Sequence, residues 1–271
     1  MINKAVILYE REDLAKNQKF VQILTDCFHE HHMDVKVMVD REDDFSRIGR
    51  NYLVVNRSRN AVLAAELEKR GATVVNSSEV TAICNNKWTT YEWARNNGIP
   101  VMETWLGGCY DCEFPIVIKS LSGHGGSEVF LAHNSREKQK FIQIIESIWG
   151  KNKYIIQPLA NTGGRDVRVY VLGGRIAVAM CRQADGGFKS NYSLGGNAIP
   201  VTLNSKEQDM IMNTVNLLKP DYAGIDFFYD GERLVLNEIE DAVGARMVYE
   251  NTELDIVKMF GDWMVKHKII C

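Results

Sequence analysis

A long apolar run is absent from the sequence. A helix that crosses a bilayer needs about 20 consecutive apolar residues, and no stretch of this chain approaches that length. The first ten residues, MINKAVILYE, are too short an apolar segment, and too soon charged, for a secretory signal peptide. We therefore expect a cytoplasmic protein with no membrane partner.

An excess of charge of one sign is also missing. The chain has 32 Lys and Arg against 35 Asp and Glu, which gives a formal net charge of −3. The sequence contains no block of like charges. Such a balance argues against a general nucleic-acid binder, although it permits a local basic cleft. Because 45% of the residues are hydrophobic, an intrinsically disordered chain is excluded as well.

Cysteines are few, and their spacing carries little information. The six cysteines are scattered through the chain, so we expect reduced thiols, at positions 27, 84, 109, 112, 181 and 271. Cys109 and Cys112 form a CxxC pair, but zinc would require a second pair and a redox pair usually opens a helix. His29 and His32 lie one helical turn apart, and a solvated helix end is a simpler interpretation than a metal site.

The 271 residues suggest two domains, or one elaborate one, at roughly 150 residues per domain. In the first third, apolar runs at 5–9, 35–39, 52–55 and 73–75 alternate with helical patterns. Strand and helix repeated at this spacing predict a parallel, doubly wound sheet. Further along, short strands separated by glycine turns, at 114–131, 166–180 and 223–239, predict antiparallel pairing.

A glycine-rich turn follows the apolar strand that ends at Lys119. Glycines let backbone N–H groups approach phosphate oxygens, and a neighbouring lysine adds positive charge. The segment matches neither the Walker loop nor the Rossmann fingerprint. By itself it is equally well explained as a mobile hairpin tip.

Carboxylates gather near the end of the last predicted strand. Glu238 and Glu240 share one face because side chains alternate along a strand. Asp226, on the strand paired with it, joins that face only if the connecting loop has an odd number of residues, and a two-residue turn would count against it. Three carboxylates in a partly buried cleft would favour a divalent cation, and a solvated acidic edge is the alternative.

Positions 163–196 are unusually rich in polar residues and glycines. Arg165, Arg168 and Arg182 lie on predicted strands, and Lys189 follows in a loop-rich stretch. Arginines on a strand can bind phosphate or carboxylate groups with two hydrogen bonds. A sheet with one solvent-exposed face and no ligand would give the same sequence pattern.

Four separated motifs together resemble the ATP-grasp enzymes and, within them, the RimK-like carboxylate–amine ligases. They are GRDVRVYV at 164–171, FKSN at 188–191 with Gly195–Gly196, AGID at 223–226 and EIEDAVG at 238–244. The resemblance extends from about Asn56 to Lys268. It implies a mixed α/β (α+β) ATP-grasp fold with an N-terminal Rossmann-like domain at 1–84, a central lid with the glycine loop at 85–160, and an antiparallel C-terminal part with the metal site at 161–271.

The resemblance also implies roles for individual residues. Lys87 and Lys119 match lysines that reach the phosphates of ATP, and Lys119 and Arg182 would act in catalysis. The other nucleotide contacts would come from the glycine loop, the strand that reads adenine, the ribose and phosphate positions and a loop segment: Ser122, Gly123, Gly125, Gly126, Gln157, Pro158, Leu159, Asp166, Arg182, Lys189, Ser190 and Asn191. Asp226, Glu238 and Glu240 match the ligands of two magnesium ions, with manganese as an alternative. Glu240 stands where the family usually has Asn, which keeps an oxygen ligand.

The activity implied is the joining of a carboxylate to an amine by way of an acyl phosphate, with release of ADP and phosphate. The substrates would be small molecules or peptides. Assembly into a homo-oligomer is compatible with the sequence. Arg57, Arg59 and Arg246 are candidates to hold an anionic group of the substrate, although the first two could instead pair with surface carboxylates. Another ATP-dependent phosphotransferase and a non-catalytic nucleotide-binding protein are the alternative functions.

Overall fold

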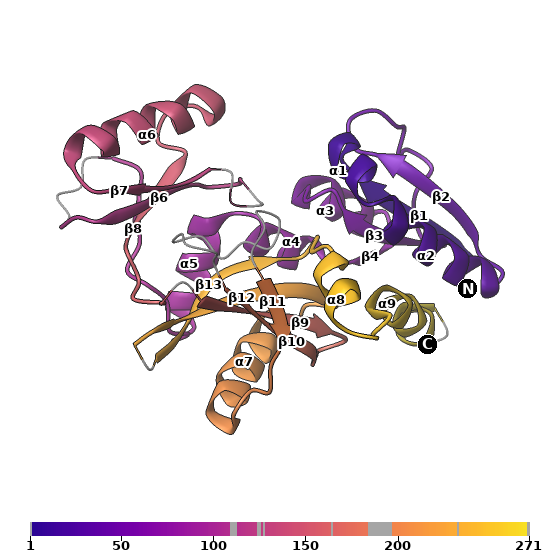
Figure 1. Ribbon diagram of the computed structural model, residues 1–271. Helices are drawn as coiled ribbons and strands as arrows, with labels where there is room; N and C mark the ends of the chain where they lie inside the picture. Colours follow the sequence, from indigo (N-terminus) through magenta and orange to yellow (C-terminus); the bar gives the residue numbers. More distant parts are fainter. Residues whose placement is uncertain are drawn as a thin grey trace.

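The computed structural model describes residues 2–108, 113–123, 126, 128–163, 165–183, 197–231 and 233–269. Its described strands form a parallel sheet and two antiparallel sheets, which make up three parts of the molecule (Figure 1). The predicted mixed α/β fold is therefore confirmed. None of the helices in these ranges combines the length and apolar character that a bilayer crossing requires.

The N-terminal part is a four-stranded parallel sheet in the order β2-β1-β3-β4. Its strands are β1 (Lys4–Tyr9), β2 (Asp34–Val39), β3 (Tyr52–Arg57) and β4 (Thr73–Val75). β1 and β3 are buried on both faces, as expected for the centre of a parallel sheet. The connecting helices are α1 (Arg11–Lys16), α2 (Gln18–Glu30) and α3 (Ala61–Lys69). The first two form a single apolar pattern in the sequence, and they are separated at Asn17, whose side-chain amide donates to the Asp13 carbonyl oxygen.

Two short helices, α4 (Ser78–Cys84) and α5 (Lys87–Asn96), come next, and a small sheet with one helix follows, which we call the lid from here on. Its antiparallel sheet has the order β5-β8-β6-β7, formed by β5 (Trp105–Leu106), β6 (Ile116–Ser120), β7 (Val129–Ala132) and β8 (Tyr154–Pro158). Helix α6 (Ser135–Trp149) covers one face and buries Ile145 against Ile116, Ile118 and Ile156. The lid therefore has a small apolar core of its own.

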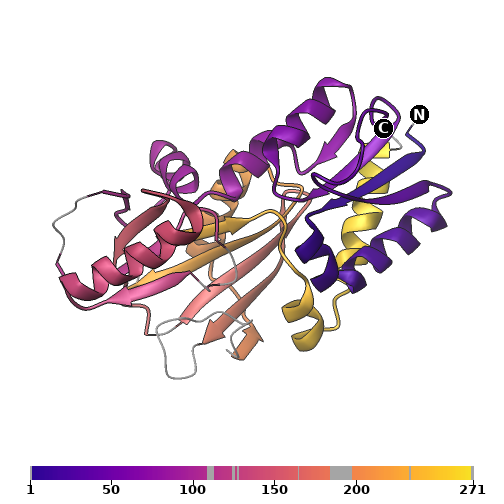
Figure 2. The same ribbon diagram turned by 90° about the horizontal axis from the view of Figure 1, so that it is seen from above.

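The largest sheet is antiparallel, in the order β11-β10-β9-β12-β13. Its strands are β9 (Arg165–Leu172), β10 (Arg175–Gln183), β11 (Asn197–Pro200), β12 (Tyr222–Asp230) and β13 (Arg233–Glu240). One face is apolar and packs against α7 (Ser205–Leu218) and against α4 and α5. Figure 2 shows the long strands of this sheet running between the lid and the N-terminal part. The chain continues into α8 (Arg246–Asn251), α9 (Ile256–Met264) and a final π-helical turn, Val265–Ile269.

The connection between β12 and β13 differs from the odd loop that the metal hypothesis required. Asp230 pairs with Arg233, which leaves two positions between the strands, so the predicted odd loop is wrong. With a regular ladder this turn would set Asp226 opposite Asn237 and direct Glu238 to the other face. Instead the register shifts by one residue between Asp226 and Phe227. This β-bulge leaves Asn237 as the extra residue and brings Glu238 opposite Asp226, on a common face.

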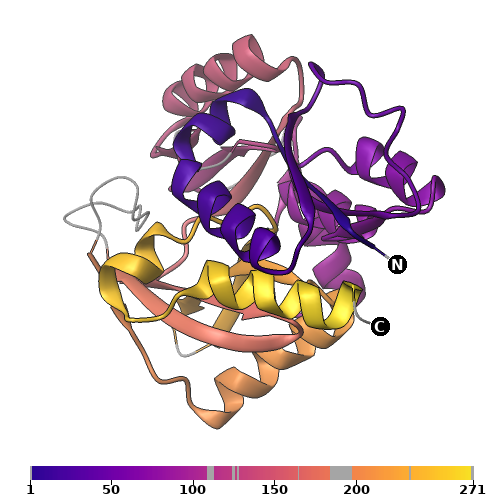
Figure 3. The same cartoon turned by 90° about the vertical axis from the view of Figure 1, so that its right-hand side faces the viewer.

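Helix α9 returns the chain to the N-terminal part. It contacts α2 and lies beside it in Figure 3. Phe260 of α9 stacks on Tyr222 of the large sheet at 4.7 Å between ring centroids. Phe20 of α2 meets the same Tyr222 edge-on at 6.0 Å. A single apolar core thus joins the parallel sheet, α9 and the large antiparallel sheet.

Candidate active site

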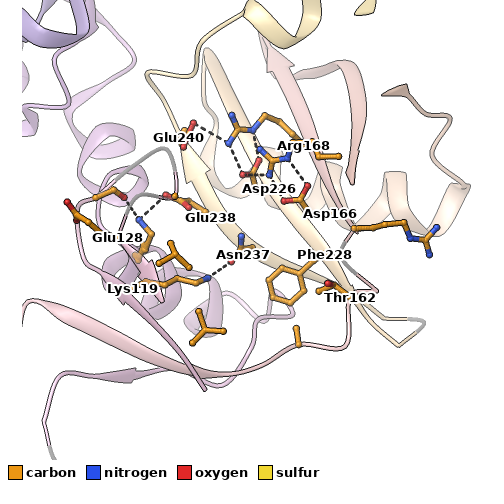
Figure 4. A pocket seen from close by; sticks show the side chains of 18 of the residues that line it. Lys119, Glu128, Thr162, Asp166, Arg168, Asp226, Phe228, Asn237, Glu238 and Glu240 are labelled. Carbon is orange, nitrogen blue, oxygen red and sulfur yellow. Dashed lines mark hydrogen bonds and ion pairs between the residues drawn. The ribbon is translucent and has the colours of Figure 1, made fainter. Parts of the chain in front are cut away.

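A cavity of about 640 Å³ lies where the three parts meet. It is lined by the lid strands β6 and β8, by the polar face of the large sheet and by segments of the N-terminal part. Figure 4 shows side chains from the lid and from the large sheet pointing toward one another across it, with Lys119 facing Asn237 and Glu238.

Most of the residues predicted from the sequence line this cavity. They include the two lysines and members of the glycine loop, the adenine strand, the ribose and phosphate positions and the carboxylates: Lys87, Lys119, Gly123, Gly126, Gln157, Pro158, Leu159, Asp166, Arg182, Asp226, Glu238 and Glu240. Ser122 is exposed and does not line it. Gly125, Lys189, Ser190 and Asn191 lie outside the described residues, as does the Cys109–Cys112 pair.

The centre of the site is a network of buried arginines and aspartates. Arg182 makes a two-pronged contact with Asp166, its partner across β9 and β10, at 2.6 and 2.5 Å. Asp226 accepts two hydrogen bonds from Arg168, at 2.6 and 2.7 Å, and one from Arg182 at 2.7 Å. Three neighbouring strands therefore present alternating charges on one face.

The charges in this network hold one another ionised. Burial by itself would raise the pKa of Asp226, but the guanidinium groups of Arg168 and Arg182 outweigh it and lower the pKa to about 2. Burial would lower the pKa of Arg168, and the carboxylates of Asp226 and Glu240 instead raise it well above its usual value. The site therefore keeps its charges in the physiological pH range.

Two buried lysines approach the carboxylates from the lid side. Lys87, the first residue of α5, places its Nζ 3.0 Å from Glu238 Oε1 and donates to the carbonyl oxygen of Gly123. Lys119 donates to Asn237 Oδ1 at 2.8 Å. Burial lowers the pKa of Lys119 to about 8, and the attraction of Glu238 only partly opposes this effect.

Asp226, Glu238 and Glu240 have the oxygen donors that magnesium prefers. They share one face of the sheet through the register described above, and each contacts a side-chain cation. Arg168 also contacts Glu240, at 3.3 Å. A bound cation would therefore replace Arg168 or Lys87 as a partner of these carboxylates. In the described part of the chain, only Cys27, His31 and Asp262 bring three metal-ligand atoms within 4.8 Å of one another.

In the sequence, Arg168 was considered only as one of several arginines on predicted strands, and Asn237 was missed as a site residue. Arg168 lies two positions after Asp166, so strand alternation alone places it on the same face. Asn237 reaches Lys119 because it is the extra residue of the bulge, which no local pattern indicates.

The three arginines proposed for the substrate have different surroundings. Arg57 is buried, and its guanidinium donates to the carbonyl oxygens of Ala242 and Val243 at 2.9 and 2.8 Å. It therefore holds the segment after Glu240 and is not accessible to a substrate. Arg59 and Arg246 both line the cavity.

Comparisons with known proteins agree with this geometry. The model of the RimK-like ATP-grasp domain family matches residues 103–264. The uncharacterized protein MG011 homolog of Mycoplasma pneumoniae is 30% identical over 249 residues, which cover 90% of this chain and 85% of that protein. Beta-citrylglutamate synthase B of Mus musculus is 29% identical over 223 residues, which cover 77% of this chain and 57% of that enzyme.

Solved structures show the same fold at lower sequence identity. The crystal structure of a RimK domain ATP-grasp protein from Sphaerobacter thermophilus superimposes with a TM-score of 0.71 at 16% identity. The match covers 96% of this chain and 98% of that one.

Proposed function

The chain belongs to the family of RimK-like ATP-grasp domains, and we propose that it joins a carboxylate to an amine through an acyl phosphate. As a member of this family it is an ATP-dependent ligase that forms C–N bonds. The observation that best supports the proposal is the cavity, in which buried and half-buried cations face buried and half-buried carboxylates: Lys87, Lys119, Arg168 and Arg182 against Asp166, Asp226, Glu238 and Glu240.

The first step overcomes the low reactivity of a carboxylate, from which an amine cannot displace oxide. A carboxylate oxygen of the substrate attacks the γ-phosphorus of ATP, the bond to the bridging oxygen breaks, and ADP is released. Lys119 and Arg182, which both line the cavity, would neutralise negative charge on the phosphoryl group as it transfers. The glycine loop, with Gly123 and Gly126 on the cavity wall, would donate backbone N–H groups to the phosphates.

Asp226, Glu238 and Glu240 would hold two magnesium ions, or manganese in their place. Magnesium supplies charge neutralisation and alignment of the phosphates in reactions of this class. Asp166 and the segment Gln157–Leu159 would contact the ribose and the adenine. These assignments, with Lys87 as a further phosphate ligand, stay predictions.

The second step forms the amide. The amine nitrogen attacks the carbonyl carbon of the acyl phosphate, the C–O bond to phosphate breaks, and the nitrogen gives up a proton. Water would hydrolyse the acyl phosphate before the amine arrived, so the reaction needs a closed site. The lid sheet lies over the cavity and is suited to exclude water.

The test measures ADP release. The full chain is incubated with ATP, magnesium and a panel of amino acids and acidic peptides, and mass spectrometry identifies the condensed product. We expect Lys119→Ala and Glu238→Gln to abolish ADP release without loss of folded structure. Matched controls are the exposed residues Lys151→Ala and Glu253→Gln, which should retain full activity.

Full turnover in either site variant would show that the assigned site is wrong. A phosphorylated product formed without any need for an amine would identify a phosphotransferase, and nucleotide binding without turnover would identify a binding protein. The cytoplasmic location and the absence of nucleic-acid partners stay predictions.

A further inference from the structure

Helices α2 and α9 meet at the thiol of Cys27, away from the active-site cavity. The two helices lie beside each other although they come from opposite ends of the chain (Figure 3). Cys27 of α2 is buried, and a Cβ on Gly261 of α9 would lie only 2.6 Å from its Sγ. A glycine at position 261 therefore leaves room for the sulfur atom, and the thiol lies between the helices.

Two further side chains with metal-binding atoms surround this thiol. His31 follows Cys27 by four residues, at the end of α2, and residues at this spacing share one face of a helix. Asp262 is the neighbour of Gly261 on α9, and its Oδ1 accepts a hydrogen bond from the thiol at 3.4 Å. One ligand atom from each of the three side chains lies within 4.8 Å of the other two. His31 and Asp262 are exposed, so an ion can approach from the solvent.

The spacing of these atoms suits a tetrahedral zinc ion. Zinc binds sulfur at about 2.3 Å and nitrogen or oxygen at about 2.0–2.2 Å, which places two ligand atoms of a tetrahedral site about 3.5 Å apart. The sulfur of Cys27 and the oxygen of Asp262 already lie at this separation. The exposed imidazole of His31 has to close a distance of at most 4.8 Å to about 3.5 Å, which a rotation of its side chain achieves. Water would take the fourth position.

An ammonium group already neutralises the carboxylate of this cluster. Lys258 Nζ lies 3.4 Å from Asp262 Oδ1 and 3.2 Å from Glu30 Oε2. A zinc ion would replace Lys258 at Asp262, and Lys258 would keep Glu30 as its partner. Burial, and then the hydrogen bond to Asp262, raise the pKa of Cys27 to about 12. Metal binding must therefore displace the thiol proton, as it does wherever a thiolate becomes a ligand.

We propose that Cys27, His31 and Asp262 form a zinc site that ties α2 to α9. A thiolate and an imidazole favour zinc, whereas magnesium prefers sites made of oxygen atoms alone. None of the three residues lines the active-site cavity, so the ion would act on stability and not on the reaction. Because α2 belongs to the N-terminal part and α9 packs on the large sheet, the ion would strengthen the junction between these two parts.

Cobalt is the probe, because it adopts the tetrahedral geometry of zinc and absorbs light when a thiolate binds it. The full chain is reduced, freed of metal with a chelator, and titrated with cobalt in excess magnesium, which competes for sites made of oxygen atoms. We expect a thiolate-to-cobalt charge-transfer band that saturates at about one cobalt per chain and disappears when zinc is added. Cys27→Ser should abolish the band, and His31→Gln and Asp262→Asn should each weaken cobalt binding by about tenfold or more.

His29→Gln is the matched control for the histidine. His29 is exposed on the same helix, but a separation of two residues places it on a different face from Cys27. This variant should keep the wild-type affinity for cobalt. If the wild type gives no band, if the band persists in Cys27→Ser, or if His31→Gln and Asp262→Asn bind cobalt as tightly as the wild type, the proposal is overturned.

Thermal unfolding gives a second measurement, which does not require any change at the buried cysteine. Zinc should raise the unfolding midpoint of the wild type and of His29→Gln, and should leave the midpoints of His31→Gln and Asp262→Asn nearly unchanged. Equal shifts in all four proteins would show that zinc acts elsewhere and would overturn the proposal. Neither measurement uses ADP release, so the outcome is independent of the ligase function.

Discussion

Lys119 is a cation whose charge depends on the pH near neutrality. Its pKa of about 8 in the free protein means that the ammonium group loses its proton as the pH rises through that value. Nucleotide phosphates favour the protonated form, so binding above pH 8 must take up a proton. We expect the affinity for the magnesium complex of a non-hydrolysable ATP analogue to fall by up to about tenfold per pH unit above 8.

Calorimetry between about pH 7 and about pH 9 measures this dependence. Lys119→Met is the control. This variant should bind the nucleotide analogue more weakly at neutral pH, and its affinity should no longer fall with the deprotonation of Lys119 above pH 8. Equal slopes in the wild type and in Lys119→Met would show that another group is responsible.

Individual site residues could be predicted where a regular pattern fixes their direction. Alternation along β9 places Asp166 and Arg168 on one face, and Glu238 and Glu240 follow the same rule on β13. Arg57 could not be assigned in this way. Its position after a strand suggested contact with the substrate, but only the folded chain brings the carbonyl groups of Ala242 and Val243 to it.

At the scale of elements, the hairpin of β12 and β13 shows what a local pattern leaves open. Both strands were predictable from their apolar alternation, and the register of their pairing was not. A two-residue turn combined with a β-bulge places Asp226 and Glu238 on a common face, as a loop with an odd number of residues would have done. The extra residue of the bulge, Asn237, accepts a hydrogen bond from Lys119 of the lid, a contact between distant residues that no local pattern contains.

The hairpin between β9 and β10 provides a test of packing between elements. Gly173 has a φ of 58°, and a Cβ at that position would lie 2.2 Å from Nε1 of Trp263 in α9. Gly174 has a φ of 75°, and a Cβ there would have no described atom within 4 Å beyond its chain neighbours. Both alanine substitutions incur the left-handed backbone penalty of about 1 kcal/mol, and Gly173→Ala adds the clash, about 1–3 kcal/mol more.

Urea denaturation of the two variants measures the difference in the free energy of unfolding. Gly174→Ala serves as the matched control for the backbone contribution. Equal destabilisation of the two variants would mean that Trp263 can move aside without loss.

At the scale of the whole molecule, Arg57 ties the parallel sheet to the segment that follows the proposed metal ligands. Its guanidinium also donates to the hydroxyl of Tyr9 and lies 3.8 Å from the ring centre of Phe20. Arg57→Met would leave two buried carbonyl groups without their donor, so we expect a loss of about 2–4 kcal/mol in the free energy of unfolding.

Chemical denaturation checks this value, with Arg70→Met as the control. Arg70 forms an exposed ion pair with Glu66, and its removal should change the free energy of unfolding by about 0.5 kcal/mol or less. A similarly small change for Arg57→Met would show that water can replace the guanidinium at these carbonyl groups.

The arrangement of the three parts was only partly predictable. Strand and helix alternation predicts the parallel N-terminal sheet, and glycine turns predict the antiparallel segments. The return of α9 to α2 joins residues more than 200 positions apart, and it depends on apolar surfaces that no short motif reveals. The cavity depends on the same assembly, because Lys16 and Arg246 line it together only in the folded chain.

The ion pairs of the cavity have a thermodynamic consequence for the order in which ligands bind. In the proposed site, magnesium alone would meet carboxylates that Lys87 and Arg168 already neutralise. Nucleotide alone would meet cations that Glu238, Asn237 and Asp226 already hold. Each ligand therefore releases the protein groups that the other needs, so the two should bind with positive cooperativity. By linkage, the factor by which magnesium strengthens nucleotide binding equals the factor by which nucleotide strengthens magnesium binding. We expect an enzyme that holds neither ligand tightly alone and responds to their joint concentration.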